Sequence, residues 1–442
     1  MKKRILIIIM LLFVIVFLSA CKKQKPLTIW VGSESQEFYA EKINDYLELY
    51  QTKNGKEFPH KIEVKAVDSS TAAATYLDDM EAGADIFTIP HDNLGKLIKG
   101  SSGIAPVTSQ ALLEQIANDN PTKFLNVIKG VVGDKEYTFG IPYVGQSQIL
   151  YYNKKYLNEN DVKSWEGILA KATQAGKKSL TLTGTDGFNN AFLLLAREKE
   201  TNYTSLRLYE NGQFENTYGI GDDTIAKLKW GQRFFNHPNG AKQASDSGWE
   251  VELKDEISLS TITGAWFFRA AQAALGSNLG IAILPEFTLT SEDAYGTALA
   301  GTVYRSGSFA DTKMFVMKKG SIYAEYLQDI ILYLSSKEVQ EQSFIVANNL
   351  PAYKNALVEF SAMSGDSIQA LLARIQLEMF DFGIPQPFGV KSTFNFYYYS
   401  KGGPELIFAI LDNKDNAYPT HASIKAQMQI IQTIWITGEK PE

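Results

Sequence analysis

The first part of the chain alternates between apolar runs and helical stripes. Residues 26–32 form a short apolar run that ends at a glycine, and residues 84–89 form another that ends before a proline; both are typical of buried strands. Alternation over 62–66 predicts another strand between these two, so that 84–89 is the third strand in chain order, whereas apolar spacing over 37–50 and 71–80 predicts helices. The order strand, helix, strand, helix, strand predicts a parallel sheet with helices on its faces.

The same kind of pattern continues to the end of the chain. Apolar runs predict strands at 137–143, 148–152, 178–182, 257–263 and 280–284. Periodic segments predict helices at 161–174, 187–199, 225–235, 266–274, 323–334 and 368–379, and two more within 403–436. These elements predict a second α/β unit, and no internal repeat indicates a solenoid or a propeller.

Composition narrows the class of protein. The 442 residues are 45% hydrophobic, which excludes a disordered chain, and the net charge of -6 disfavours a nucleic-acid partner. One cysteine excludes an internal disulfide framework. The four histidines are scattered rather than set at metal-ligand spacing, and no dinucleotide or phosphate-binding loop occurs, so we expect neither a metal nor a cofactor.

The N-terminus carries the most specific short pattern. Within residues 1–20, three basic residues precede an apolar run and then Ser-Ala, directly before Cys21, the only cysteine. This arrangement is typical of an export signal peptide, because the run is too short to span a bilayer comfortably. It resembles the bacterial lipobox, in which the cysteine becomes a lipid-carrying N-terminus. The resemblance implies a protein anchored on the extracytoplasmic face of the cell membrane, with 21–26 as the lipidated linker; a plain secretory signal is the alternative.

Short motifs follow one another in a characteristic order along the mature chain. They are LTIWVGSES at 27–35, GADIFTIPHDNLG at 83–95, YTFGIPY at 137–143, LYYNK at 150–154, SWE at 164–166, TGAWF at 263–267 and GIAILP at 280–285. Together and behind a lipobox, they resemble the extracellular solute-binding lipoproteins of bacterial ABC importers, in particular the maltose- and maltodextrin-binding branch. The resemblance covers nearly the whole mature chain.

The resemblance implies an α/β, two-lobed periplasmic-binding-protein-like fold of class II. Each lobe would be a mostly parallel sheet flanked by helices, with a hinge between the lobes. Residues 27–144 plus 298–344 would form the N-terminal lobe, and residues 145–297 plus 345–442 the C-terminal lobe. We expect a monomer that captures an oligosaccharide in the interlobe cleft and delivers it to the permease of an ABC importer. It would not be an enzyme.

A sugar site needs aromatic rings against C–H faces and polar groups for the hydroxyls. By the resemblance, Trp266 and Phe188 are stacking residues, and Gln146 stands where the family commonly has a carboxylate. The resemblance also implies polar contacts from Glu34 and Ser35, which follow the first predicted strand, and from Asp92 and Asn93, which follow the third. A late stacking position of the family falls on Asn395 or Phe396.

Each candidate also has a structural interpretation. Trp266 and the two phenylalanines after it fit a core, and Asp92 fits a helix cap. The maltodextrin binders often carry a tryptophan where this chain has Ile89 and Pro90, so fewer aromatic platforms are present and another carbohydrate stays open.

Other functions also remain open at this stage. Glu34 and Asp92 could act as the acid and base of a surface glycoside hydrolase. A lobe pair of this kind could also serve adhesion or signalling. The same fold carries binders of other solutes, so fold alone does not fix the ligand class.

Overall fold

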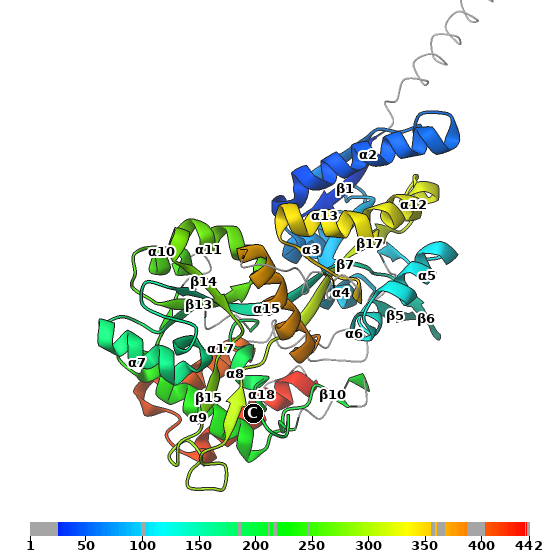
Figure 1. The fold of residues 1–442 in the computed structure, drawn as a ribbon. Coiled ribbons are helices and arrows are strands. Elements are labelled where there is room, and N and C mark those ends of the chain that lie inside the picture. The colour runs from blue at the N-terminus through cyan, green and yellow to red at the C-terminus, as the bar shows by residue number, and fades with distance from the viewer. Residues whose placement is uncertain are drawn as a thin grey trace, which may run out of the picture.

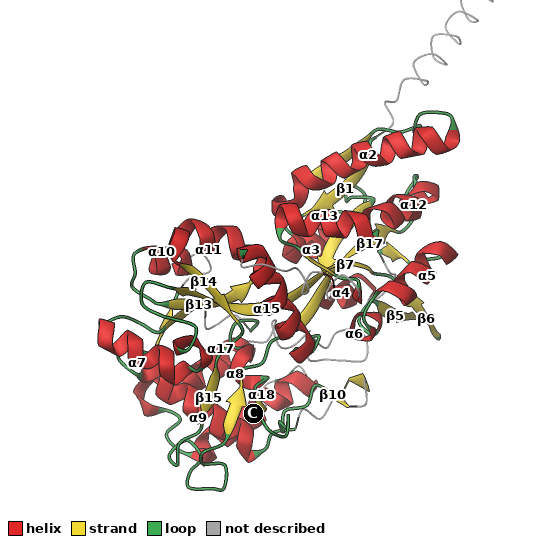
Figure 2. Cartoon of the chain, viewed as in Figure 1, coloured by secondary structure: helices red, strands yellow, loops and turns green. Residues whose placement is uncertain are grey.

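The computed structural model describes residues 25–98, 103–183, 187–210, 213–214, 219–244, 248–354, 359, 367–386, 403–437 and 439. The predictions for the signal peptide, Cys21, Asn395 and Phe396 lie outside these residues. The described chain forms two α/β lobes, one at the upper right of Figure 1 and one at its lower left. Helices flank the strands of both lobes (Figure 2). The predicted two-lobed α/β fold is therefore confirmed.

The first lobe is built on β1 (Leu27–Val31), which pairs in parallel with β2 (Ile62–Ala66) and β3 (Ile86–Pro90). Helices α2 (Gln36–Asn54) and α3 (Ser69–Asp78) connect these strands, as the sequence predicts. The neighbouring elements are α4 (Leu94–Ile98), β4 (Ile104–Ala105), α5 (Gln110–Asp119), α6 (Thr122–Leu125), β5 (Lys129–Val132), β6 (Lys135–Thr138), β17 (Ala310–Lys318), α12 (Ala324–Leu334), α13 (Lys337–Ala347) and β18 (Leu350–Pro351).

The second lobe is built on β8 (Leu180–Leu182), which pairs in parallel with β12 (Ala241–Gln243) and β13 (Ser260–Gly264). Its helices are α7 (Trp165–Ala175), α8 (Ala191–Leu194), α9 (Asp222–Asn236), α10 (Gly248–Lys254), α11 (Phe268–Leu275), α15 (Ile368–Phe382), α17 (Gly403–Asp412) and α18 (His421–Thr437). Its other strands are β9 (Arg197–Glu198), β10 (Tyr209–Glu210), β11 (Gln213–Phe214), β14 (Leu279–Ala282), β15 (Glu286–Thr288) and β16 (Val303–Arg305).

One long strand, β7 (Ile141–Asn153), joins the two lobes (Figure 1). Its first half pairs with β17 and β18, and its second half pairs with β13 and β14, all antiparallel. The sequence predicted two separate runs, 137–143 and 148–152, because polar residues interrupt the apolar pattern between them. That separation was wrong: the polar residues at 146–148 are buried and paired in the ladder where the chain crosses between lobes.

Two hydrophobic cores correspond to the two lobes. The first takes its buried residues from 27–144 and 314–339, and the second takes them from 149–309 and 372–435. Tyr304 and Phe309 belong to the second core, so the chain returns to the first core near Ala310. A small third cluster lies at the crossing and includes Phe124 and Phe380. Each lobe is therefore stabilised mainly by its own burial of apolar surface.

The helix predicted for 187–199 is mostly absent. Only α8 is helical in this stretch, and Arg197 and Glu198 instead form β9, which pairs with β16. Residues 191–196 are all buried, so the segment has no polar face to balance the apolar one. The conformation of residues 187–199 is therefore set by burial on every side and by a strand partner distant in sequence, and not by local periodicity.

Lys123 of the first lobe holds the end of α15, which packs beside the crossing. Lys123 Nζ donates to the carbonyl oxygens of Phe380 at 2.7 Å and of Gly383 at 3.3 Å. The same ammonium lies 4.4 Å from the centre of the Phe380 ring. Carbonyls at a helix C-terminus have no partner within the helix, so a cation there is stabilising.

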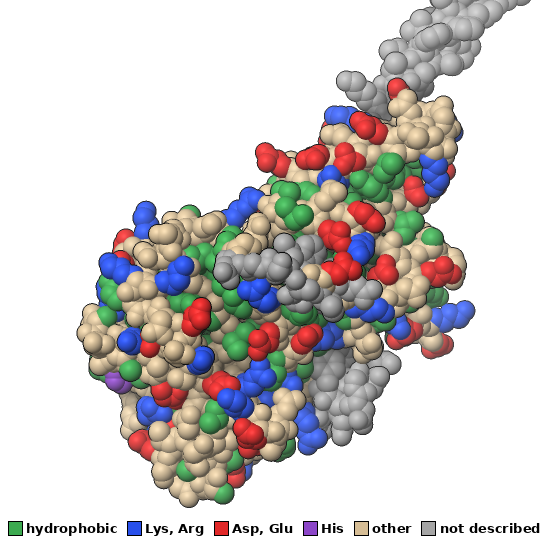
Figure 3. Space-filling view, in the orientation of Figure 1, with side chains coloured by type: hydrophobic (Ala, Val, Ile, Leu, Met, Phe, Trp, Pro, Cys, Tyr) green, Lys and Arg blue, Asp and Glu red, His purple; other side chains and the backbone are tan. Residues whose placement is uncertain are grey.

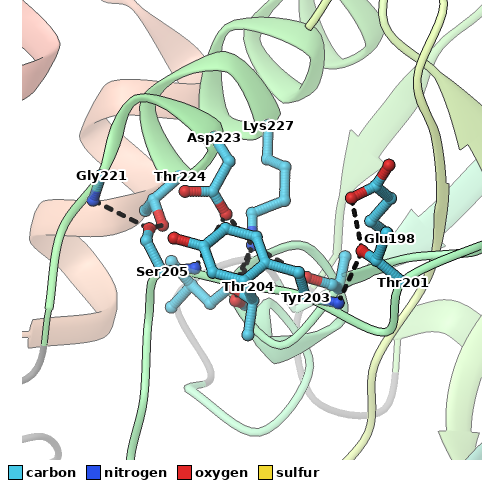
Figure 4. Close-up of polar contacts among 11 residues, drawn as sticks. Glu198, Thr201, Tyr203, Thr204, Ser205, Gly221, Asp223, Thr224 and Lys227 are labelled. Atoms are coloured by element: carbon cyan, nitrogen blue, oxygen red, sulfur yellow. Dashed lines mark hydrogen bonds and ion pairs between the residues drawn. The ribbon is translucent and has the colours of Figure 1, made fainter.

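Lys227 of α9 organises a buried polar network inside the second lobe (Figure 4). Its Nζ donates to the carbonyl oxygens of Leu194 and Ala196 and to Thr204 Oγ1, at 3.3, 2.8 and 2.9 Å. Asp223 Oδ2 lies 3.7 Å away, and both side chains are almost fully buried. Burial lowers the pKa of Lys227 to about 8, although Asp223 acts to raise it.

We expect Lys227→Met to destabilise the second lobe strongly. The substitution leaves the Asp223 carboxylate buried without its cation, and breaking such a pair costs about 3–5 kcal/mol. Lys229→Met on the same helix is the control, since Lys229 is only half-buried and should change the free energy of unfolding by less than ~0.5 kcal/mol. Urea unfolding measures both, and equal midpoints for the two variants would contradict the structural role of Lys227.

Candidate functional site

The first lobe presents a charged group where its strands end. Glu34 follows β1, and its Oε1 accepts a hydrogen bond from Lys313 of β17 at 2.9 Å. Burial acts to raise the pKa of Glu34, but the ion pair and hydrogen bond with Lys313 outweigh it, so the pKa is lowered. Asp68, which caps α3, is close enough for its charge to act on Glu34. One lysine therefore faces two carboxylates at this edge of the sheet.

Two predicted contact residues of this lobe, Ser35 and Asn93, are buried and already hydrogen-bonded within the protein. Ser35 Oγ accepts from Asn349 Nδ2 at 3.1 Å, and Asn93 Oδ1 accepts from Lys96 Nζ at 2.6 Å. Asp92 is half-buried beside Asn93 in the turn after β3. Glu34 and Asp92 are thus the more accessible members of the four polar positions predicted in this lobe.

A buried carboxylate lies where β17 crosses between the lobes. Asp311 stands opposite Gln146 of β7 in the ladder, and its oxygens accept from the backbone nitrogen and the side-chain amide of Gln386. His91 Nε2 lies 3.8 Å from Asp311 Oδ1 and 2.9 Å from the Gln386 carbonyl oxygen. Burial raises the pKa of Asp311 to about 6, and Asp92 adds to the increase, whereas His91 and Gln386 oppose it. This cluster connects three chain segments at the crossing.

The second lobe contributes an aromatic corner. The rings of Phe188 and Trp266 lie 5.8 Å apart at 59°, and Phe309 lies 5.8 Å behind Phe188. A Cβ atom on Gly264 would stand about 2 Å from carbons of the Trp266 ring, so only glycine allows the indole to fold back over the end of β13. Phe188 and Trp266 are both partly accessible.

The structure brings together Phe188 with Trp266, and Glu34 with Lys313. Gln146 is almost fully buried at the crossing between these two groups. Lys313 and Asp311 could not be recognised from the sequence, because their partners Glu34 and His91 lie more than two hundred positions away along the chain. Gln148, which stands beside the aromatic corner, is a further residue that no sequence motif indicates.

Two lobes that share crossing strands are the architecture of the solute-binding proteins of bacterial importers. The chain belongs to the bacterial extracellular solute-binding protein family, whose model matches residues 45–365. No curated protein matches the chain.

Solved structures of sugar-binding proteins share the fold. The maltodextrin-binding protein MalE1 of L. casei BL23, without ligand, is 18% identical with a TM-score of 0.69, covering 92% of this chain and 99% of that one. The Thermus thermophilus maltotriose-binding protein with maltotriose is 18% identical, with a TM-score of 0.67 and the same coverage. Maltose-binding MalE of Listeria monocytogenes with maltose is 16% identical, with a TM-score of 0.68, covering 95% and 100%.

Across the described ranges, no helix has the length and apolar character needed to cross a membrane. The same residues contain no group of three or more His, Cys, Asp or Glu side chains that could hold a metal ion.

Asp311→Asn should change how stability depends on pH. A carboxyl whose pKa is raised by folding stabilises the protein fully below its unfolded pKa of 3.8, and that stability is lost as the pH rises through about 6. Between pH 4 and pH 7 the wild type should therefore lose about 2–3 kcal/mol relative to Asp311→Asn. The asparagine side chain can still form hydrogen bonds with Gln386, because the Gln386 amide can turn so that its oxygen accepts from the new side-chain amide.

Urea unfolding at several pH values tests this expectation. The matched control is Asp119→Asn, which removes an exposed carboxylate at the end of α5. Parallel stability profiles for the wild type and Asp311→Asn would contradict the assignment.

Proposed function

We propose that the chain captures an oligosaccharide between its two lobes and delivers it to the membrane permease of an ABC importer. The tilted pair of Phe188 and Trp266 carries this proposal, because two partly accessible rings offer a stacking surface for the C–H faces of a sugar. The charged group around Glu34 in the other lobe supplies polar partners for hydroxyls. The solved proteins that share the fold and bind maltodextrin, maltose or maltotriose support the same ligand class.

Surface charge agrees with a neutral ligand. Acidic and basic side chains are interspersed over the face drawn in Figure 3. The net charge of -6 gives no bulk attraction for a polyanion. A sugar held by stacking and hydrogen bonds needs no such attraction.

We propose binding without turnover. A glycosidase acid needs a raised pKa, so that it carries a proton at working pH. The pKa of Glu34 is lowered instead, because Lys313 outweighs its burial. Glu34 is therefore unsuited to the role of the acid in the hydrolase alternative.

We also propose lobe boundaries from the two cores. One lobe comprises residues 27–144 and about 310–347, and the other comprises residues 145–309 and 367–437. This division follows the buried residues of each core. The sequence predicts that the chain returns to the first lobe at residue 298. The proposed boundary lies later, at the start of β17, because Tyr304 packs in the second core.

The protein is proposed to act as a monomer.

A thermal-shift panel tests the ligand class. The full-length chain in detergent is incubated with maltose, maltotriose, longer maltodextrins and unrelated disaccharides. A sugar at ~100 times its Kd should stabilise the fold by about 2.7 kcal/mol, which moves the melting midpoint by a measurable amount. Trp266→Ala should lower the affinity about 10-fold to 100-fold, since it removes one stacking surface.

Phe235→Ala is the control for the tryptophan variant. Phe235 lies on α9, and its ring packs edge-on against Phe234 and Phe408. Its loss should leave sugar affinity unchanged. A panel in which no sugar shifts the wild-type midpoint would reject the carbohydrate proposal, and shortened products after incubation would reject binding without turnover.

We further propose that Cys21 carries lipid and anchors the protein to the cell membrane. The support is the sequence around Cys21, which resembles a lipobox. Cys21→Ser should move the protein from the membrane fraction to the medium or the soluble fraction, whereas Ser19→Ala should leave it on the membrane. Fractionation with immunoblotting measures this, and an unchanged membrane fraction for Cys21→Ser would refute the anchor.

A further inference from the structure

Gln148 lies on the same face of the sheet as the Trp266 ring. It occupies the half of β7 that pairs with β13, directly opposite Gly264. Opposite residues of an antiparallel pair project on the same face. The Trp266 indole covers that face at Gly264. Ser147, the preceding residue, points to the other face and donates to the Gln376 carbonyl oxygen of α15.

The Gln148 amide is held in a defined position beside both rings. Its Nε2 donates to Asn189 Oδ1 at 3.3 Å, and Asn189 directly follows Phe188. Its backbone nitrogen donates to Ser308 Oγ at 2.8 Å, which fixes the strand at this point. The amide nitrogen therefore has a hydrogen-bond partner, and the position of the residue in the ladder is fixed.

The oxygen of this amide has no hydrogen-bond partner. Gln148 is fully buried, and its Oε1 makes no hydrogen bond. A buried carbonyl oxygen without a partner is costly, and such groups in native proteins call for an explanation. An amide oxygen accepts hydrogen bonds, whereas a sugar hydroxyl can donate one. The aromatic corner next to it is the place where the proposed sugar would stack.

We infer that Gln148 Oε1 accepts a hydrogen bond from one hydroxyl of the bound sugar, and that Asn189 holds the amide in the orientation that permits it. The inference rests on the proposed function, since it specifies how the same site selects its ligand. The rings of Phe188 and Trp266 bind any sugar face of suitable shape. Gln148 adds a requirement for a hydroxyl at one ring position, because a ligand without it leaves the oxygen unpaired.

Gln148→Leu tests this inference, since leucine is close in volume and has no acceptor. The probe is maltotriose, together with analogues that each lack one hydroxyl, titrated calorimetrically into the full-length chain in detergent. The wild type should bind one analogue on the order of 10-fold to 100-fold more weakly than maltotriose. Gln148→Leu should bind maltotriose more weakly by a similar factor, and should bind that analogue as tightly as it binds maltotriose.

Asn189→Ala provides a second test if the leucine variant does not fold. It frees the Gln148 amide to rotate, so discrimination against the same analogue should fall by several-fold. A chemically matched control is Asn236→Ala, which removes an amide that bonds within the second lobe at Gln232 and Leu411, outside the aromatic corner. This control should keep the wild-type discrimination.

The possible outcomes separate the two proposals. If the wild type binds maltotriose and both the Gln148 and Asn189 variants discriminate among the analogues as it does, this inference is overturned alone. If the wild type binds no sugar of the panel, the proposed function fails and the inference fails with it. Loss of discrimination in either variant, with the control unchanged, supports the inference.

Discussion

The continuity of β7 is the constraint on which the rest of the structure depends. One strand supplies ladder partners to both lobes, and every residue along it is buried. Any change in the angle between the lobes must therefore be absorbed by the few residues around the crossing, at 144–148 of β7 and near 310 of β17. The Asp311 cluster lies at this crossing and connects it to Gln386. A buried carboxylate with several partners favours one arrangement of these segments, because each alternative leaves polar groups unpaired.

The two lobes contribute different kinds of interaction to the candidate site. The first lobe offers charge, with Glu34 held by Lys313 at the ends of its strands. The second lobe offers aromatic surface, with Trp266 folded over Gly264 and facing Phe188. Stacking is tolerant of ligand identity, whereas hydrogen bonds to fixed partners are selective. A ligand that contacts both lobes thus combines general affinity from one with orientation from the other.

The order of strands and helices could be predicted from the sequence, because apolar periodicity reports which face of each element is buried. The segment at 187–199 was not predictable in this way, since Phe192 and its neighbours are buried on all sides and β9 depends on a partner about a hundred residues later. The polar run around Gln146 looked like a break between strands, although the ladder satisfies its backbone. Lys313 could not be assigned to Glu34 from sequence, because 279 positions separate them and only the fold brings them together.

The interleaving of the chain between two cores also has a consequence for how the protein is made. The first core needs Val339, and the second needs Trp435, which lies in the last helix. A polypeptide that emerges from the ribosome N-terminus first therefore cannot complete its first core until Val339 has been made, or its second core until synthesis is nearly over. Closing contacts between such distant segments is slow, so the nascent chain stays expanded for an extended period. An expanded chain is the form that can be threaded across a membrane, which suits a member of an extracellular protein family.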